Sequence, residues 1–143
     1  MREILFRGRI SKNEWVYGLP IEGEPLMGGG KETCIVTKPG LSYYDGVLMT
    51  YDECVEVDPD TVGQFTGLTD KNGTKIFEGD IVRYGDTIHR VVFEQRNGTA
   101  YFGLVYAACE TLPFGHYQDL KQIEVIGNIH DNPELLEVSG DEP

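Results

Sequence analysis

The chain has few cysteines, few basic residues and no long hydrophobic run. Its three cysteines, Cys34, Cys54 and Cys109, are odd in number and widely spaced, which argues for reduced thiols and against a disulfide framework. No run approaches the ~18 apolar residues of a transmembrane helix. The start, MREILFRGRI, lacks the apolar core of a signal peptide. We therefore expect a soluble, cytoplasmic protein.

Basic residues are scarce: 12 Lys and Arg stand against 24 Asp and Glu, which gives a net charge of −12. Such a chain gains little from counterion release on DNA or RNA, which requires clustered cations. The acidic charge favours a role in solubility over a surface built for a basic partner. One local exception lies near the start, where a strand would place four basic residues on a solvated face: Arg2, Arg7, Arg9 and Lys12.

What is abundant favours strands and turns. There are 18 glycines, and Tyr, Phe, Val, Ile and Thr are frequent. A hydrophobic content of 40% is ordinary for a folded protein, and 143 residues suit one domain or two very small ones. The composition therefore predicts a mostly-β protein with many short strands.

The first third reads as a hairpin followed by a loop and a third strand. Apolar residues alternate in residues 2–10 and again in residues 15–21, with a polar break between them. Residues 22–32, which contain three consecutive glycines, predict a flexible loop. The next segment, residues 32–38, predicts a short strand that ends at Pro39-Gly40.

The middle of the chain is less definite. Residues 41–57 fit either one short helix or two strands, and both alternatives stay open. Residues 58–64, DPDTVGQ, are rich in turn formers and mark a boundary between subdomains. We therefore divide the chain into an N-terminal β-hairpin subdomain (1–62), a small barrel of the SH3 type with a terminal helical turn (63–137), and a disordered tail (138–143).

Two Asn-Gly pairs predict two hairpins in the second subdomain. A two-residue turn at Asn72-Gly73 would set Asp70 opposite Lys75, an attractive cross-strand pair, and Leu68 opposite Phe77. A turn at Asn97-Gly98 organises a hairpin over residues 87–106 with clean alternation. Its expected cross-strand pairs are Val91 with Leu104, Phe93 with Phe102, and Glu94 with Tyr101.

The C-terminal part predicts one more strand and a helical turn. Ile123 and Val125 alternate with Glu124. Asn132 is then placed as an N-cap, with Pro133 at the first helical position. About five short strands between residues 63 and 130 suit a small, partly open barrel.

Residues 67–84, GLTDKNGTKIFEGDIVRY, concentrate acidic residues and glycines, and so were tested as a cation or phosphate site. Numbered from Asp70, a calcium loop would need glycine where Lys75 stands and glutamate where Ile81 stands. A phosphate loop also fails, because GGGKET has Glu32 after Lys31. We predict a structural turn at Glu78-Gly79-Asp80 in which the two acids stay solvated, and neither metal nor cofactor.

Catalytic and binding constellations are equally sparse. The histidines, His89, His116 and His130, are far apart and show no zinc-site spacing. A nucleophile pair of Cys109 and His116 stays open, although the apolar run VYAAC favours a buried cysteine. Five aromatic residues fit a small core better than a binding face, with the Ser42–Asp45 turn the most exposed part: Trp15, Tyr43, Tyr44, Tyr51 and Tyr117.

Four blocks of sequence resemble the YopX family of small bacteriophage and prophage proteins: REILFRG, WVYG, VGQFTGLTDKNGTKIFEGDIV and EVIGNIHDNPELLE. The order and spacing of the blocks match from Arg2 to about Glu137. The resemblance implies an all-β protein with a later SH3-like barrel, and action inside a bacterial host. It supplies no catalytic residues.

These observations leave three functional hypotheses. The leading one is a non-enzymatic accessory protein that contacts a phage or host protein, with homo-oligomers as one form of that contact because edge strands invite pairing. A nucleic-acid-binding barrel would need Arg2, Arg7, Arg9 and Arg90 in one groove. A small-substrate enzyme would need Cys109, a histidine and a carboxylate within hydrogen-bond reach.

Overall fold

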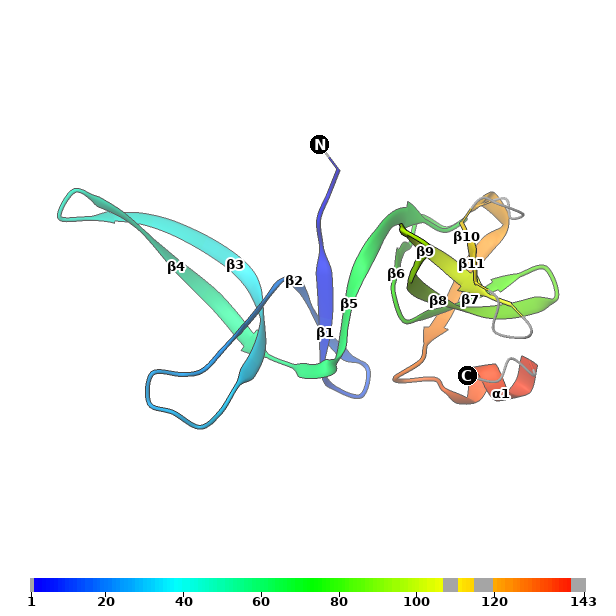
Figure 1. Cartoon of the computed structure of the whole chain (residues 1–143), viewed down its shortest axis with the longest axis horizontal. Helices are drawn as coiled ribbons and strands as arrows, with labels where there is room; N and C mark the ends of the chain where they lie inside the picture. The colour runs from blue at the N-terminus through cyan, green and yellow to red at the C-terminus, as the bar shows by residue number, and fades with distance from the viewer. Residues whose placement is uncertain (1, 107–110, 115–119, 140–143) are drawn as a thin grey trace. The chain divides into compact units, whose positions relative to one another are not determined.

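The computed structural model describes residues 2–106, 111–114 and 120–139, and most of them lie in antiparallel strands (Figure 1). The mostly-β prediction is confirmed. The strands are β1 (Phe6–Ser11), β2 (Glu14–Gly23), β3 (Glu32–Tyr44), β4 (Val47–Glu56), β5 (Asp58–Thr69), β6 (Lys75–Phe77), β7 (Asp80–Tyr84), β8 (Thr87–Arg96), β9 (Thr99–Val105), β10 (Thr111–Pro113) and β11 (Ile123–Asn128). A 3-10 turn (Leu120–Gln122) precedes β11, and α1 (Glu134–Ser139) follows it.

The chain divides into two compact units, an N-terminal unit of Glu3–Gln64 and a C-terminal unit that begins at Phe65. In the N-terminal unit the strand order is β4-β3-β2-β1-β5. The predicted first hairpin is confirmed by β1 and β2, which pair Arg7 with Tyr17 and Arg9 with Trp15. Its turn places Asn13 at a φ of 61°, a conformation that asparagine tolerates better than most residues.

The prediction that a strand ends at Pro39-Gly40 is wrong, because β3 continues through both residues to Tyr44. Beyond Val36, β4 is the only described strand that pairs with β3. Because the other edge of β3 has no described partner strand there, Pro39 can be tolerated although it has no N–H to donate to a second strand. The two alternatives for residues 41–57 are resolved in favour of two strands. They meet at Asp45-Gly46, where φ values of 51° and 77° form a tight hairpin turn.

The turn predicted at residues 58–64 is also wrong, since these residues form the first half of β5. The register with β1 shifts between Arg7, which pairs with Gly63, and Arg9, which pairs with Asp58. Within this bulge the Arg9 N–H donates to the Thr61 hydroxyl oxygen at 2.9 Å. A bulge tolerates proline in a strand, which explains how Pro59 is accommodated.

The C-terminal unit contains a five-stranded sheet with the order β10-β9-β8-β7-β11. Its core contains the buried residues Ile76, Val82, Val91, Leu104 and Ile123. The hairpin predicted over residues 87–106 is confirmed in full, with all three expected cross-strand pairs in register. Closure of these strands into an SH3-like barrel stays a prediction.

The register predicted around Asn72-Gly73 is wrong. Thr69 pairs with Lys75 and Phe65 pairs with Phe77, with a register shift between them. Gly73 has a φ of 80°, but Asn72 does not have a positive φ, so the two-residue turn that the prediction required does not form. The loop is longer, and Asp70 therefore belongs to it and not to the ladder.

The helical turn at the C-terminus is present as α1, which extends through Ser139 into the segment predicted as a tail. Residues 140–143 lie outside the described part. The Asn132 carbonyl accepts the Leu135 N–H at 3.1 Å, and its Oδ1 accepts the Asn128 N–H at 3.2 Å. The N-cap role of Asn132 stays a prediction. In the described residues α1 is the only α-helix, and it is too short to cross a membrane.

Backbone packing in β2 generates a testable prediction. A Cβ added at Gly18 would collide with the carbonyl oxygen of Val36 on β3, whereas a Cβ at Gly23 on the same strand would meet nothing within 4 Å. Gly18→Ala should therefore lower the free energy of unfolding by about 2 kcal/mol or more, since a paired backbone cannot move aside. Urea denaturation followed by the fluorescence of Trp15, the single tryptophan, measures this in the same unit.

Gly23→Ala is the matched control and should change the free energy of unfolding by less than about 0.5 kcal/mol. Equal effects of the two substitutions would contradict the close approach of β2 and β3 at Gly18.

Candidate functional site

In residues 67–84, two of the acidic side chains accept hydrogen bonds from backbone N–H groups. Asp70 is 7% exposed and Asp80 is 2% exposed. The prediction that the acids of the Glu78-Gly79-Asp80 turn stay solvated is therefore wrong for Asp80, and Glu78 is half-buried. The Asp80 carboxylate accepts the Phe77 N–H at 2.7 Å. Gly79 lies in the turn between β6 and β7. Its N–H donates to the Val91 carbonyl and its own carbonyl accepts the Ile129 N–H, both at 2.9 Å. The Glu78-Gly79-Asp80 turn is thus built into the fold.

Asp70 has the most demanding role. Its Oδ1 accepts the N–H groups of Asn72 at 2.8 Å and Thr74 at 2.9 Å, and its Oδ2 accepts that of Val125 on β11 at 2.9 Å. Burial by itself raises the pKa of Asp70, but the N–H donors from Val125, Thr74 and Asn72 and the charge of Lys71 outweigh it and hold this pKa below its ordinary value. The carboxylate therefore stays ionised at neutral pH.

Metal binding finds no support in the described ranges, where no three His, Cys, Asp or Glu side chains come together to hold an ion. His89 is buried, and its Nδ1 lies 2.9 Å from the Val105 carbonyl oxygen, to which it donates. Its Nε2 lies 2.7 Å from the Thr87 hydroxyl, and its ring packs on Tyr106 at 4.3 Å. His89 is thus a packed residue of the core with a satisfied ring.

The thiols offer little nucleophilic chemistry where the structure describes them. Cys34 is half-buried and Cys54 is exposed, and neither forms a disulfide with another described residue. Burial first, and then the neighbouring Cys54, Glu56 and Glu32, raise the pKa of the Cys34 thiol, which disfavours its reactive thiolate. Cys109 and His116, the predicted nucleophile pair, lie outside the described residues.

The N-terminal basic residues do not share one solvated face, contrary to prediction. Arg7 is 6% exposed, and its guanidinium lies 4.5 Å from the centre of the Trp15 ring. Arg2 and Lys12 are exposed, whereas Arg9 is half-buried. Arg7 is therefore a packing residue in the N-terminal unit, where a cation over an indole face is favourable.

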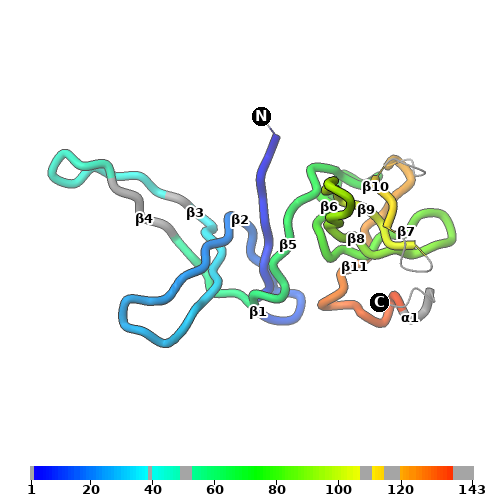
Figure 2. The backbone as a smooth tube through the Cα atoms, in the orientation of Figure 1, coloured from blue at the N-terminus to red at the C-terminus, as the bar shows by residue number. Residues whose placement is uncertain are grey.

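A group of five exposed apolar side chains lies on the distal part of the β3–β4 hairpin, residues 38–53, which we call the arm. β2 pairs with β3 only over residues 32–36. Beyond these residues β3 and β4 pair with each other as a two-stranded ribbon that ends at Tyr44 and Val47. The ribbon is the extended hairpin labelled β3 and β4 in Figure 1, and Figure 2 traces its backbone.

The arm exposes large apolar side chains on both faces. Residues directly opposite in an antiparallel pair share a face, so Leu41, Tyr43 and Leu48 lie on one side, and Tyr44 and Val47 on the other. All five are between 55% and 73% exposed. The predicted exposure of the Ser42–Asp45 turn is confirmed for its two tyrosines, whereas Trp15 is half-buried. Tyr117 lies outside the described residues, as does the side chain of Tyr51.

Sequence reasoning missed Leu41, Val47 and Leu48 as surface residues. The alternation of Leu41 with Tyr43 was a usable signal, but it could not be applied while residues 41–57 fitted both a helix and strands.

An all-β chain with an extended hairpin and a small antiparallel sheet is the class that this architecture defines. The family model of the YopX protein matches residues 6–137, and the chain belongs to the YopX family. The structure is also similar to the crystal structure of protein EF1440 from Enterococcus faecalis, with a TM-score of 0.59 and 24% sequence identity over 95% of this chain and 99% of that one. This likeness shows the fold. A comparison with curated proteins gave no significant match.

The bonds of Asp70 generate a prediction on stability and pH. Asp70→Asn replaces an acceptor oxygen with an N–H₂ group facing a backbone donor, so the free energy of unfolding should fall by about 2–4 kcal/mol at neutral pH. Because the pKa of Asp70 is lower in the folded than in the unfolded chain, its contribution is present above the unfolded pKa of ~4 and is lost as the pH falls through the folded pKa.

Urea denaturation followed by circular dichroism at pH 7 and near pH 3 measures this contribution, and the gap between the two proteins should narrow at the lower pH. Asp86→Asn, at an exposed turn, is the control and should behave as the wild type. A gap that persists unchanged in acid would contradict the role of the ionised carboxylate.

Proposed function

We propose that this chain is a non-enzymatic protein–protein interaction module of a phage or prophage, acting in the cytoplasm of the bacterial host, and that its arm pairs with the arm of a second copy. The single observation that carries the proposal is the exposed apolar arm of residues 38–53. The phage setting and the host cytoplasm rest on the family resemblance.

The arm is an unstable arrangement for an isolated chain in water. A two-stranded ribbon is marginally stable at best, and it needs a third strand or a packed face for independent stability. The proximal part of β3 has that third strand in β2, but the arm does not have one among the described strands. A partner that covers its faces or extends its ladder would supply what is missing.

Charge favours a second copy as that partner. Residues 39–51 contain one charged residue, Asp45, in a chain whose charged content is 25%. Two molecules of net charge −12 repel each other over most of their surfaces, and least where charges are absent. An apolar, nearly uncharged segment is also what one copy of the arm can offer another, because the same surface serves both sides of a twofold interface.

Area and hydrogen bonding agree with this choice. Tyr43 and Tyr44 alone expose roughly 300 Å² at their observed exposures of over 70%, and Leu41, Val47 and Leu48 enlarge the patch. Two such arms would approach the roughly 1,200 Å² at the lower end of specific interfaces only where each arm wraps around the other and covers both of its faces. β4 is the terminal strand of its sheet, so its outer edge is open to an added strand within the described structure.

Sedimentation velocity and light scattering over a range of concentrations test the proposal. Wild-type protein should form dimers or larger assemblies. The triple variant Leu41→Ser, Tyr43→Ser, Leu48→Ser removes the apolar side chains from one face and should weaken association at least about tenfold, which corresponds to ~1.4 kcal/mol. An unchanged circular dichroism spectrum and Trp15 fluorescence would show that the sheet persists.

The double variant Leu26→Ser, Met27→Ser is the matched control, because both side chains are almost fully exposed but lie outside the arm. It should associate as the wild type does. Wild-type protein that stays monomeric at high concentration would overturn pairing with a second copy, as would an equal loss of association in the control.

A further inference from the structure

The C-terminal unit concentrates its positive charge in one groove. From Phe65 onward the sequence has 6 basic and 13 acidic residues, a net charge of −7. Three of those six cations, Lys71, Arg83 and Lys121, line two adjoining pockets. These three residues are far apart in the sequence, which is why sequence reasoning did not group them. A local excess of cations in an acidic unit favours an anionic ligand.

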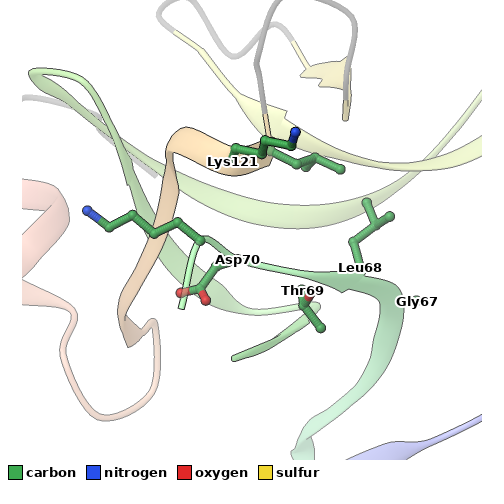
Figure 3. A pocket seen from close by; sticks show the side chains of 7 residues that line it. Gly67, Leu68, Thr69, Asp70 and Lys121 are labelled. Atoms are coloured by element: carbon green, nitrogen blue, oxygen red, sulfur yellow. The ribbon is translucent and has the colours of Figure 1, made fainter. Parts of the chain in front are cut away.

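The groove lies where the bulged end of β5 meets the segment that leads into β11. Its larger pocket has a volume of 590 Å³ and includes Leu68 and Leu120, and the smaller has 330 Å³ and includes Arg83. Both are lined by Lys71 and Lys121, and we refer to the two adjoining pockets together as the groove. Figure 3 shows Lys121 opposite the strand that carries Leu68 and Thr69. These volumes fall in the range of small-molecule sites.

Two carboxylates, those of Asp70 and Glu124, lie beside the three cations of the groove. The Lys71 Nζ lies 3.9 Å and the Arg83 Nη1 3.6 Å from the same oxygen of Glu124, beyond direct hydrogen-bond distance. The oxygens of Asp70 are held by three backbone N–H groups. In Figure 3 this carboxylate points away from Lys121. Glu124 is therefore shared between two cations without a direct hydrogen bond to either. A bound anion can compete with Glu124 for both cations.

We propose that the groove binds a small phosphate-bearing molecule of the nucleoside di- or triphosphate class. Lys71, Arg83 and Lys121 would contact the phosphate groups, because charge-assisted hydrogen bonds from lysine and arginine are the strong interactions with phosphate oxygens. Leu68 and Leu120 provide apolar surface for a ring. A compact anion meets only the groove, whereas a nucleic acid would extend over the surrounding acidic surface and be repelled.

Titration of the full chain with ATP at low ionic strength, followed by amide NMR shifts and calorimetry, tests this site. Saturable shifts should centre on Lys71, Arg83, Lys121 and Glu124. Lys121→Gln should weaken binding about tenfold, and Glu124→Gln should strengthen it about threefold, because removing the competing carboxylate frees both of its cations. Such a gain in affinity is a result that a merely structural role for Glu124 would not produce.

Arg96→Gln removes the same charge from the exposed end of β8, outside the groove, and should leave binding unchanged. The site is overturned by the absence of saturable shifts, by shifts centred elsewhere, or by equal weakening in Arg96→Gln and Lys121→Gln. Tighter binding of a single-stranded oligonucleotide than of ATP at the same residues would overturn the ligand class. Neither result depends on the arm, which belongs to the other unit.

Discussion

The buried carboxylate of Asp70 is the interaction on which the C-terminal unit most depends. It connects the loop after β5 to β11, 55 residues further along the chain, by accepting N–H groups from both. A buried carboxylate is costly unless its oxygens are satisfied, and three backbone donors satisfy these. The Lys71 N–H adds a bond to the Ile123 carbonyl at 2.9 Å beside it. The same connection positions the two segments that line the cationic groove.

The arm of the N-terminal unit shows the opposite situation. Its ribbon has its own ladder and a tight turn at Asp45-Gly46, but it has large apolar side chains in solvent on both faces. The C-terminal unit places comparable residues, such as Val91 and Leu104, in a core. The difference between the two units is the presence of a covering layer, and this difference is why a binding role is assigned to the arm.

Prediction from sequence succeeded where neighbouring residues alone determine the backbone conformation. It failed where a contact with a distant segment of the chain determines it. The hairpin at Asn97-Gly98 was predicted to the residue because both turn residues adopt left-handed φ values. The identical dipeptide at Asn72-Gly73 failed because Asp70 draws the loop toward β11, a partner that no local pattern reveals. Pro39 was taken as a strand end and Pro59 as part of a turn-rich boundary, yet a one-sided ladder accommodates the first and a bulge the second. For the candidate site, only the exposure of Tyr43 and Tyr44 was foreseen.

By itself, the sequence determined the mostly-β class, the alternating strands, two of the tight turns and the membership in the YopX family, because periodicity and turn chemistry act over a few residues. Only the tertiary structure decided that Asp70, Asp80 and Arg7 are buried, that no strand of the described part covers the arm, and that Lys71, Arg83 and Lys121 line one groove. Burial and the grouping of charges depend on which distant segments pack together, and that packing is a property of the whole fold.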